Sequence, residues 1–225
     1  MFAPPYVAPD RFDAQLAAEG HAVVSPATVQ RSFGIAAEAL AALRPSWSDL
    51  PADGYLKDGG RYRFRRHSCF AADHGAEGQT LTLAPHRAHW QPLDYNALHG
   101  GIERWFEPMA AEVIAQAAWP QLLLGLAGVA DRLKGQRPWF IEAHQFRIDT
   151  TDGIGRPTPE GAHRDGVDLV AVFLVDRHQI KGGESRVFEA QGPMGQRFTM
   201  SEPWTLLLLD DERVIHETTP IQPDG

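Results

Sequence analysis

A short run of residues in the C-terminal half carries groups that can hold a metal ion. His163 and Asp165 are separated by one residue in the run Glu-Gly-Ala-His-Arg-Asp-Gly. On an extended backbone, residues two apart project from the same face, so this imidazole and carboxylate can reach one point in space. They are two of the three ligands in the 2-His-1-carboxylate set that binds non-haem Fe(II). His216, on a later apolar segment, is the candidate for the third ligand.

The spacing of this pair has little specificity on its own. The chain contains 10 histidines and 29 acidic residues among 225, so about one His-x-acid pair is expected by chance. Its context favours a metal site: the pair lies between two predicted strands, a glycine follows it at once, and His216 lies on an apolar strand. An exposed pair in a turn is the alternative. The histidines without partners at ligand spacing, which we predict not to bind metal, are 21, 67, 74, 86, 89, 99 and 178.

Sequence patterns predict a helical first part, about residues 1–134, and a strand-rich second part from residue 139. The predicted helices are 10–18, 25–43, 101–118 and 120–133. The predicted strands are 61–70, 139–149, 168–176, 185–190, 197–200, 204–209 and 213–218. Short strands after helices are typical of a mainly β protein, a sandwich or barrel braced by helices. Because the helices need an apolar partner, we expect a single domain over residues 1–225.

Composition narrows the class of protein. The net charge of −8 argues against a nucleic-acid binder or a protein of anionic membrane surfaces, so the expected partner is a small molecule. Cys69 is the single cysteine, which excludes an intrachain disulfide and a zinc site made of several thiolates. No secretory signal is recognisable, and the longest apolar run is far shorter than the roughly 20 residues of a membrane span. We therefore expect a cytoplasmic protein, of oligomeric state unknown.

Several motifs together resemble a known family. These are the ligand run Pro-Thr-Pro-Glu-Gly-Ala-His-Arg-Asp-Gly, the segment Gly-Gly-Glu-Ser-Arg-Val-Phe, and Leu-Asp-Asp-Glu-Arg-Val-Ile-His-Glu-Thr-Thr-Pro around His216. Upstream, His144-Gln-Phe-Arg is similar to a first core strand, and Arg63-Phe-Arg-Arg-His-Ser-Cys-Phe to an Arg-x-Arg-x-x-Ser segment. Over roughly residues 55–220 the chain resembles the bacterial 2-oxoglutarate/Fe(II) dioxygenases that hydroxylate free amino acids, the isoleucine hydroxylase group.

The resemblance implies a double-stranded β-helix, the jelly-roll of about eight strands. It implies Fe(II) held by His163, Asp165 and His216, with 2-oxoglutarate and O2 as co-substrates. It also implies hydroxylation or sulfoxidation of a free aliphatic or thioether L-amino acid, with release of succinate and CO2. In such an enzyme the protein supplies ligand geometry and a dry, shaped pocket.

Further site residues follow from the resemblance. Gln145 and Arg147 share one face of the strand 139–149 and are candidates for contact with the co-substrate. Arg63, Arg65 or Arg66 is expected to receive the substrate carboxylate. Periodicity favours Arg66 and the resemblance favours the other two, so the choice stays open.

One departure from the family is visible. Members carry an arginine soon after the distal histidine, which pairs with the far carboxylate of 2-oxoglutarate. Here residues 219–225 read as a loop without arginine, and the strand count is one short. We expect a last strand with that arginine beyond Gly225. The alternative is a catalytically silent β-helix that binds a metal or small molecule and has a regulatory role in stress or surface behaviour.

Overall fold

Two long antiparallel strands form one wall of the molecule. The structure, a computed structural model, describes residues 2–76, 78–95, 98 and 100–225. Strand β2 (Arg63–Gly75) pairs with β4 (Trp139–Ile148) over ten residues, and with the hairpin strand β3 (Gly78–Leu83) on its other edge. A second antiparallel sheet has the order β1 (His21–Val24), β9 (Thr205–Leu209), β5 (Val170–Leu174).

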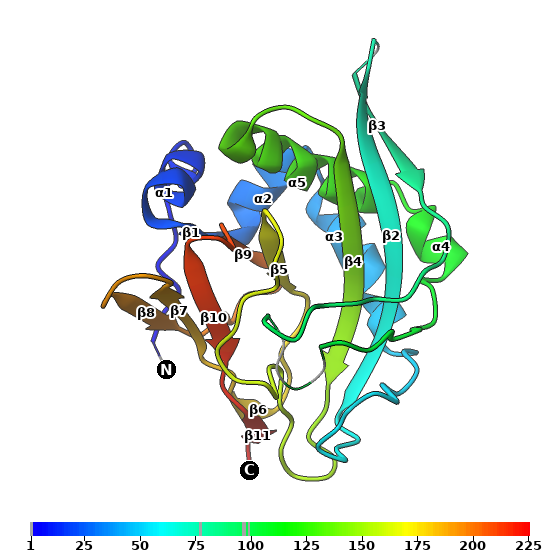
Figure 1. The fold of residues 1–225 in the computed structure, drawn as a ribbon, viewed down its shortest axis with the longest axis vertical. Helices are drawn as coiled ribbons and strands as arrows, with labels where there is room; N and C mark the ends of the chain where they lie inside the picture. Colours follow the sequence, from blue (N-terminus) through cyan, green and yellow to red (C-terminus); the bar gives the residue numbers. More distant parts are fainter. Residues whose placement is uncertain (1, 77, 96–97, 99) are drawn as a thin grey trace.

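Helices cover the outer side of these two sheets (Figure 1). They are α1 (Phe12–Glu19), α2 (Pro26–Phe33), α3 (Ala37–Leu43), the 3₁₀ helix η1 (Arg44–Trp47), α4 (Ala111–Ile114) and α5 (Ala118–Lys134). Apolar side chains of α5 such as Leu122 and Leu123 pack with Phe70 of β2 and Leu206 of β9 in one buried cluster. This shared core makes the helices and both sheets mutually dependent, because neither layer covers its apolar face alone.

The remaining strands form the opposite side of the molecule. β10 (Val214–Thr218), β7 (Ser185–Glu189) and β8 (Gly195–Phe198) make an antiparallel sheet in that order. β6 (Ile180–Gly182) pairs with β11 (Ile221–Pro223). In Figure 1, β10 stands across from β2 and β4, and irregular segments run through the space between them. The fold is mainly β with several antiparallel sheets, as expected of a jelly-roll with helical support.

Three local predictions were wrong. The helix predicted for 25–43 is two helices, because Gly34 ends α2 in the left-handed conformation (φ +66°). Within the helix predicted for 101–118, only Ala111–Ile114 is helical apart from the first residue of α5. The tail 219–225, read as a loop, contains β11, whose Pro223 is tolerated at the end of a short strand with one partner.

Candidate active site

His163 and His216 face each other across an antiparallel β-bridge. The backbone N–H of each donates to the carbonyl of the other, at 3.0 and 2.9 Å. In such a closely bonded pair the two side chains emerge on the same face, and the ring centroids lie 4.6 Å apart. His216 belongs to β10, whose register with β7 is fixed over five residue pairs. The bridge therefore transmits the rigidity of this sheet to the irregular segment that carries His163.

Asp165 completes the group. Its Oδ1 lies 3.7 Å from Nε2 of His163 and its Oδ2 lies 3.8 Å from Nε2 of His216. The three predicted ligands thus converge, with ligand atoms within 4.8 Å of one another. The side chain of Asp165 is 26% exposed, so solvent reaches this ligand group.

A buried carboxylate holds the turn that presents Asp165. Asp211, fully buried, accepts hydrogen bonds from the backbone N–H groups of Asp165, Gly166 and Val167, between 2.7 and 3.2 Å. Gly166 has φ +79°, and a Cβ there would lie 2.7 Å from the ring of Tyr95. Both features fix the backbone on which Asp165 stands. The sequence pattern gave no sign of Asp211, because its partners lie some 45 residues away.

Charge and burial shape the protonation of the three residues. Burial works against a charged His163, but the hydrogen bond and charge of Asp165, with the charge of Glu160, raise its pKa to about 9. Burial lowers the pKa of His216. Burial favours a neutral Asp165, but His163 and His216 outweigh it and lower its pKa. In the metal-free protein at neutral pH, His163 is therefore in its protonated, positively charged form, beside the carboxylates of Asp165 and Glu160.

The donor set fits a divalent non-haem iron ion. Two imidazoles and one carboxylate form the facial set with open positions. Nδ1–H of His163 donates to the carbonyl of Gly161 at 2.9 Å, so Nε2 is the nitrogen that can bind a metal once its proton is displaced. Glu160, whose Oε1 lies 3.5 Å from Nε2 of His163, was part of the quoted motif but was not predicted to contribute.

The three predicted substrate arginines lie in different surroundings. Arg63 is buried and paired with buried Asp53 at 2.7 Å. Arg65 is also buried, with its guanidinium 3.7 Å and 4.3 Å from the ring centroids of Phe106 and Phe146. Arg66 is partly exposed and paired with Glu107 at 3.0 Å. Arg65 is therefore the one most enclosed by aromatic side chains.

Gln145 and Arg147 are not brought to the three ligands. Gln145 donates to the Ser46 hydroxyl, and Arg147 donates to the carbonyls of Trp47 and Ser48. These contacts attach β4 to the η1 region on the helix side of the sheet. Strand alternation places them on the face opposite to Glu142 and His144. Their predicted role in co-substrate binding has no support in these contacts.

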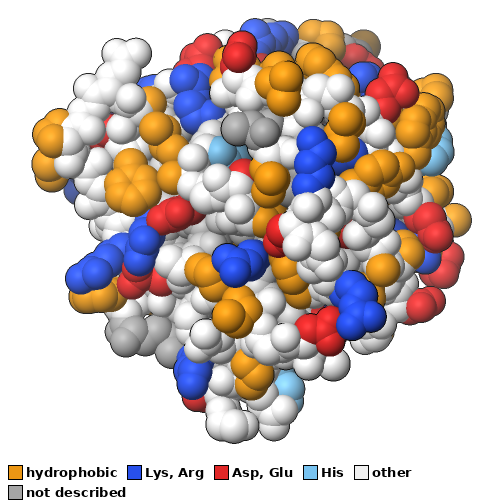
Figure 2. Space-filling view, turned by 60° about the horizontal axis from the view of Figure 1, so that its bottom comes forward, with side chains coloured by type: hydrophobic (Ala, Val, Ile, Leu, Met, Phe, Trp, Pro, Cys, Tyr) orange, Lys and Arg blue, Asp and Glu red, His pale blue; other side chains and the backbone are white. Residues whose placement is uncertain are grey.

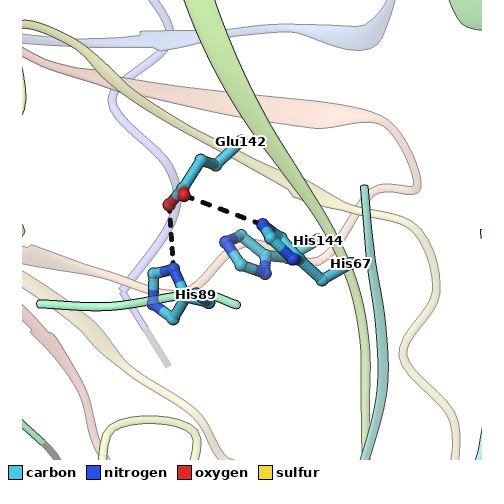
Figure 3. Close-up of side chains that lie close together, drawn as sticks. All are labelled: His67, His89, Glu142 and His144. Atoms are coloured by element: carbon cyan, nitrogen blue, oxygen red, sulfur yellow. Dashed lines mark hydrogen bonds and ion pairs between the residues drawn. The ribbon is translucent and has the colours of Figure 1, made fainter. Parts of the chain in front are cut away.

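A second polar group, which we call the β2–β4 cluster, was missed from sequence. It consists of His67, His89, Glu142 and His144, with ligand-type atoms within 4.8 Å of one another (Figure 3). His67 and His144 are directly opposed on β2 and β4, with ring centroids 4.5 Å apart. His89 comes from the irregular segment before α4, and its Nδ1–H donates to Glu142 at 2.8 Å. The partners are far apart in sequence, so no spacing rule finds them.

A hydrogen-bonded chain connects the two groups. Gln91 donates to Oδ1 of Asp165 at 2.9 Å and accepts from Arg104 at 2.8 Å. Arg104 is opposite His89 in a two-residue antiparallel bridge. One segment therefore joins the two groups: its His89 contacts Glu142 of the β2–β4 cluster, and its Gln91 contacts the predicted metal ligand Asp165.

Comparisons with known proteins identify the family. Residues 44–225 match the 2OG-Fe dioxygenase family. A bsmA homolog from Methylobium petroleophilum PM1 is 48% identical, with a TM-score of 0.92, over 99% of this chain and 88% of that chain. No curated protein matches in sequence. The chain belongs to the 2OG-Fe dioxygenase family, whose members use Fe(II), 2-oxoglutarate and O2, and it is a 2-oxoglutarate-dependent non-haem iron dioxygenase.

More distant structures share the fold. IDO from Bacillus thuringiensis is 16% identical with a TM-score of 0.77, over 97% of this chain and 92% of that one. The Fe(II)/α-ketoglutarate-dependent dioxygenase TqaL is 16% identical with a TM-score of 0.70, over 96% of this chain and 80% of that one.

The face of the molecule drawn in Figure 2 carries charges of both signs. On the face shown in Figure 2, basic and acidic side chains are interspersed, without a continuous patch of one sign. No described helix has the length and apolar character that a membrane crossing requires. The family acts on small-molecule substrates, which agrees with the net charge of the chain.

Proposed function

We propose that the protein oxidises a free aliphatic or thioether L-amino acid, by hydroxylation or sulfoxidation, with conversion of 2-oxoglutarate to succinate and CO2. The observation that carries the proposal is the convergence of His163, Asp165 and His216, which Gln91 connects to the buried Arg104. A free amino acid needs a fixed cation for its carboxylate, and Arg65 is the best placed of the three predicted arginines.

In this proposal His163, Asp165 and His216 hold Fe(II), which, when bound with 2-oxoglutarate, supplies O2 activation for attack on a C–H bond or a sulfur. Gly161 orients His163 through its carbonyl. Asp211 holds the turn of Asp165, and Gln91 holds the carboxylate of Asp165 through Oδ1. These contacts fix the donor atoms before a metal arrives, which limits the reorganisation that binding requires. The arginine expected after Gly225 for the far carboxylate of 2-oxoglutarate stays a prediction.

The proposal is tested by anaerobic titration with Fe(II) and 2-oxoglutarate, followed by exposure to O2 and assay of succinate with a panel of free L-amino acids. We expect succinate release above the amino-acid-free rate for at least one aliphatic or thioether member, with an oxidised amino acid formed in equal amount. Oxidation of peptides or nucleic acids alone would show that the amino-acid assignment is wrong. Tight binding of metal without any turnover would favour the catalytically silent alternative.

A further inference from the structure

The β2–β4 cluster lies on the face of the long sheet that also carries Arg65. Residues two apart on a strand share a face, so Arg65 and His67 of β2 project with Glu142 and His144 of β4. Nη2 of Arg65 donates to Nδ1 of His144 at 2.7 Å. His89 closes the group from the other side through its bond to Glu142 (Figure 3). The cluster is thus a built polar site, with buried groups from three segments.

Spacing alone would allow this cluster to hold a second metal ion, but its charges oppose one. Because a guanidinium only donates, Nδ1 of His144 must be the acceptor, and the proton of neutral His144 then occupies Nε2. Three buried guanidiniums, of Arg63, Arg65 and Arg104, face three carboxylates, of Asp53, Glu142 and Glu160, so these charges balance. A divalent cation would add two positive charges that no group of this set compensates.

The unused hydrogen-bonding groups describe a different ligand. Nε of Arg65 and Nε of Arg104 are buried and have no partner among the described residues. Buried N–H groups of this kind are costly unless a ligand accepts from them, and a carboxylate is the acceptor that suits a guanidinium. Glu142 has an acceptor to spare: its Oε2 accepts from His89, whereas its Oε1 lies 3.9 Å from His67, beyond hydrogen-bond distance.

Glu142 also stays ionised and reachable. Burial favours its neutral form, but the hydrogen bond and charge of His89, together with the charges of neighbouring basic side chains such as Arg87, outweigh burial and lower its pKa. Of its side chain, 27% is exposed. Burial lowers the pKa of His67 to about 4, so this neighbour is neutral at physiological pH and does not cancel the negative charge. The site therefore offers a fixed anion, Glu142, next to the fixed guanidiniums of Arg65 and Arg104.

We propose that the cluster is the receptor for the charged end of the amino-acid substrate: Arg65 and Arg104 bind its α-carboxylate, and Glu142 binds its α-ammonium. This inference rests on the proposed function. A zwitterion is complementary because it carries both charges and adds no net charge to the interior. Through Gln91, Arg104 is one side chain away from Asp165, so the side chain of a substrate held here is the part free to extend to the metal site.

The test compares ligands that lack one charge. Binding to the anaerobic, Mn(II)- and 2-oxoglutarate-loaded protein is measured by calorimetry for L-isoleucine, 3-methylpentanoic acid, which lacks the ammonium, and 2-methylbutylamine, which lacks the carboxylate. L-leucine, L-valine and L-methionine are measured with their own analogues, and the tightest-binding series is used. The variants are Glu142→Gln and Arg104→Met, with Arg132→Met, in a surface pair with Asp13, as the control.

The wild-type protein should bind each analogue at least about 10-fold more weakly than the amino acid, since each lacks a charge-assisted bond. Glu142→Gln should weaken amino-acid and amine binding about 10- to 100-fold and leave acid binding within about 3-fold. Arg104→Met should weaken amino-acid and acid binding and leave amine binding unchanged. Arg132→Met should match the wild type. If Arg104→Met does not fold, as judged by circular dichroism, Arg104→Lys replaces it, and Glu142→Gln remains decisive.

The inference is overturned if both variants weaken all three ligands equally or none of them. It is also overturned if Asp165→Ala protein binds one equivalent of Zn(II) that Glu142→Gln removes, because the cluster is then a metal site.

If an amino acid supports succinate release but the variants behave like Arg132→Met, the receptor is wrong and the proposed function stands. If the charge-specific pattern appears without succinate release, the receptor stands and the proposed activity fails. If no amino acid binds or supports turnover, both are wrong.

Discussion

His163 and His216 are paired residues of one antiparallel bridge, hydrogen-bonded to each other through both backbone N–H groups. The bridge therefore fixes the points on the backbone from which the two imidazoles project. Asp165, two residues from His163, takes its position from the same segment and from Asp211. A ligand set fixed in this way binds metal with little ordering of the protein, and the following predictions test this.

Replacement of Asp165 by alanine should abolish turnover and leave the protein folded. The side chain is a ligand in a solvent-accessible space, not part of the apolar core, so its loss removes a donor without leaving a cavity. Succinate release and the far-ultraviolet circular dichroism spectrum measure the two effects. Asp152→Ala, which removes an exposed carboxylate paired with Arg61, is the matched control and should retain activity. Normal turnover in Asp165→Ala protein would refute the assignment of this ligand.

Replacement of Asp211 by alanine should both destabilise the protein and weaken the metal site. Three backbone N–H groups lose a charged acceptor, at a cost of about 3 kcal/mol in unfolding free energy. Because the turn that carries Asp165 then loses its anchor, metal affinity should fall about 10- to 100-fold. Asp211→Asn keeps one acceptor oxygen, so its unfolding free energy and metal affinity should lie between those of the wild type and of Asp211→Ala. Urea denaturation and Mn(II) titration report the two quantities. Equal metal affinity in all three proteins would contradict a positioning role.

Metal affinity should rise with pH between about 6.5 and 8.5. The pKa of His163 in the metal-free protein is raised to about 9, so below that pH a metal must displace one proton. Each unit of pH in this range makes the neutral form about ten times more abundant, and the observed dissociation constant should fall about 10-fold per unit. His216 and Asp165 add no proton because their pKa values are lowered. Anaerobic Mn(II) titration at a series of pH values measures the slope, and a flat profile would contradict this protonation state.

The three arginines of β2 should differ in what their loss changes. Arg63→Ala leaves Asp53 buried without its closest partner and should lower the unfolding free energy by about 3 kcal/mol or more. Arg66→Ala removes a partly exposed pair and should change stability by about 1 kcal/mol at most. Arg65→Ala should raise the KM for the amino acid about 10- to 100-fold. Denaturation and steady-state kinetics separate the cases. If all three proteins show wild-type KM values, none of these residues anchors the substrate.

The sequence was sufficient to single out the three residues that converge in the structure, and most of the strands. His163 and Asp165 stand in one short segment, and His216 lies on an apolar strand, so local patterns point to all three. Asp211 was missed because its function consists of bonds to the backbone of a distant turn. His89 and Glu142 were missed for a related reason: one lies on an irregular segment and the other on a strand, and only tertiary packing joins them. The tail strand β11 was missed because Pro220 and Pro223 hide its pairing with β6.

The most direct test of the central claim is the position of a bound metal. Crystals grown anaerobically with Fe(II) and 2-oxoglutarate, measured at the iron absorption edge, locate the ion by its anomalous signal. The account predicts one strong peak within bonding distance of Nε2 of His163, Nε2 of His216 and the carboxylate of Asp165. A peak among His67, His89 and Glu142, with none at His163, would contradict it.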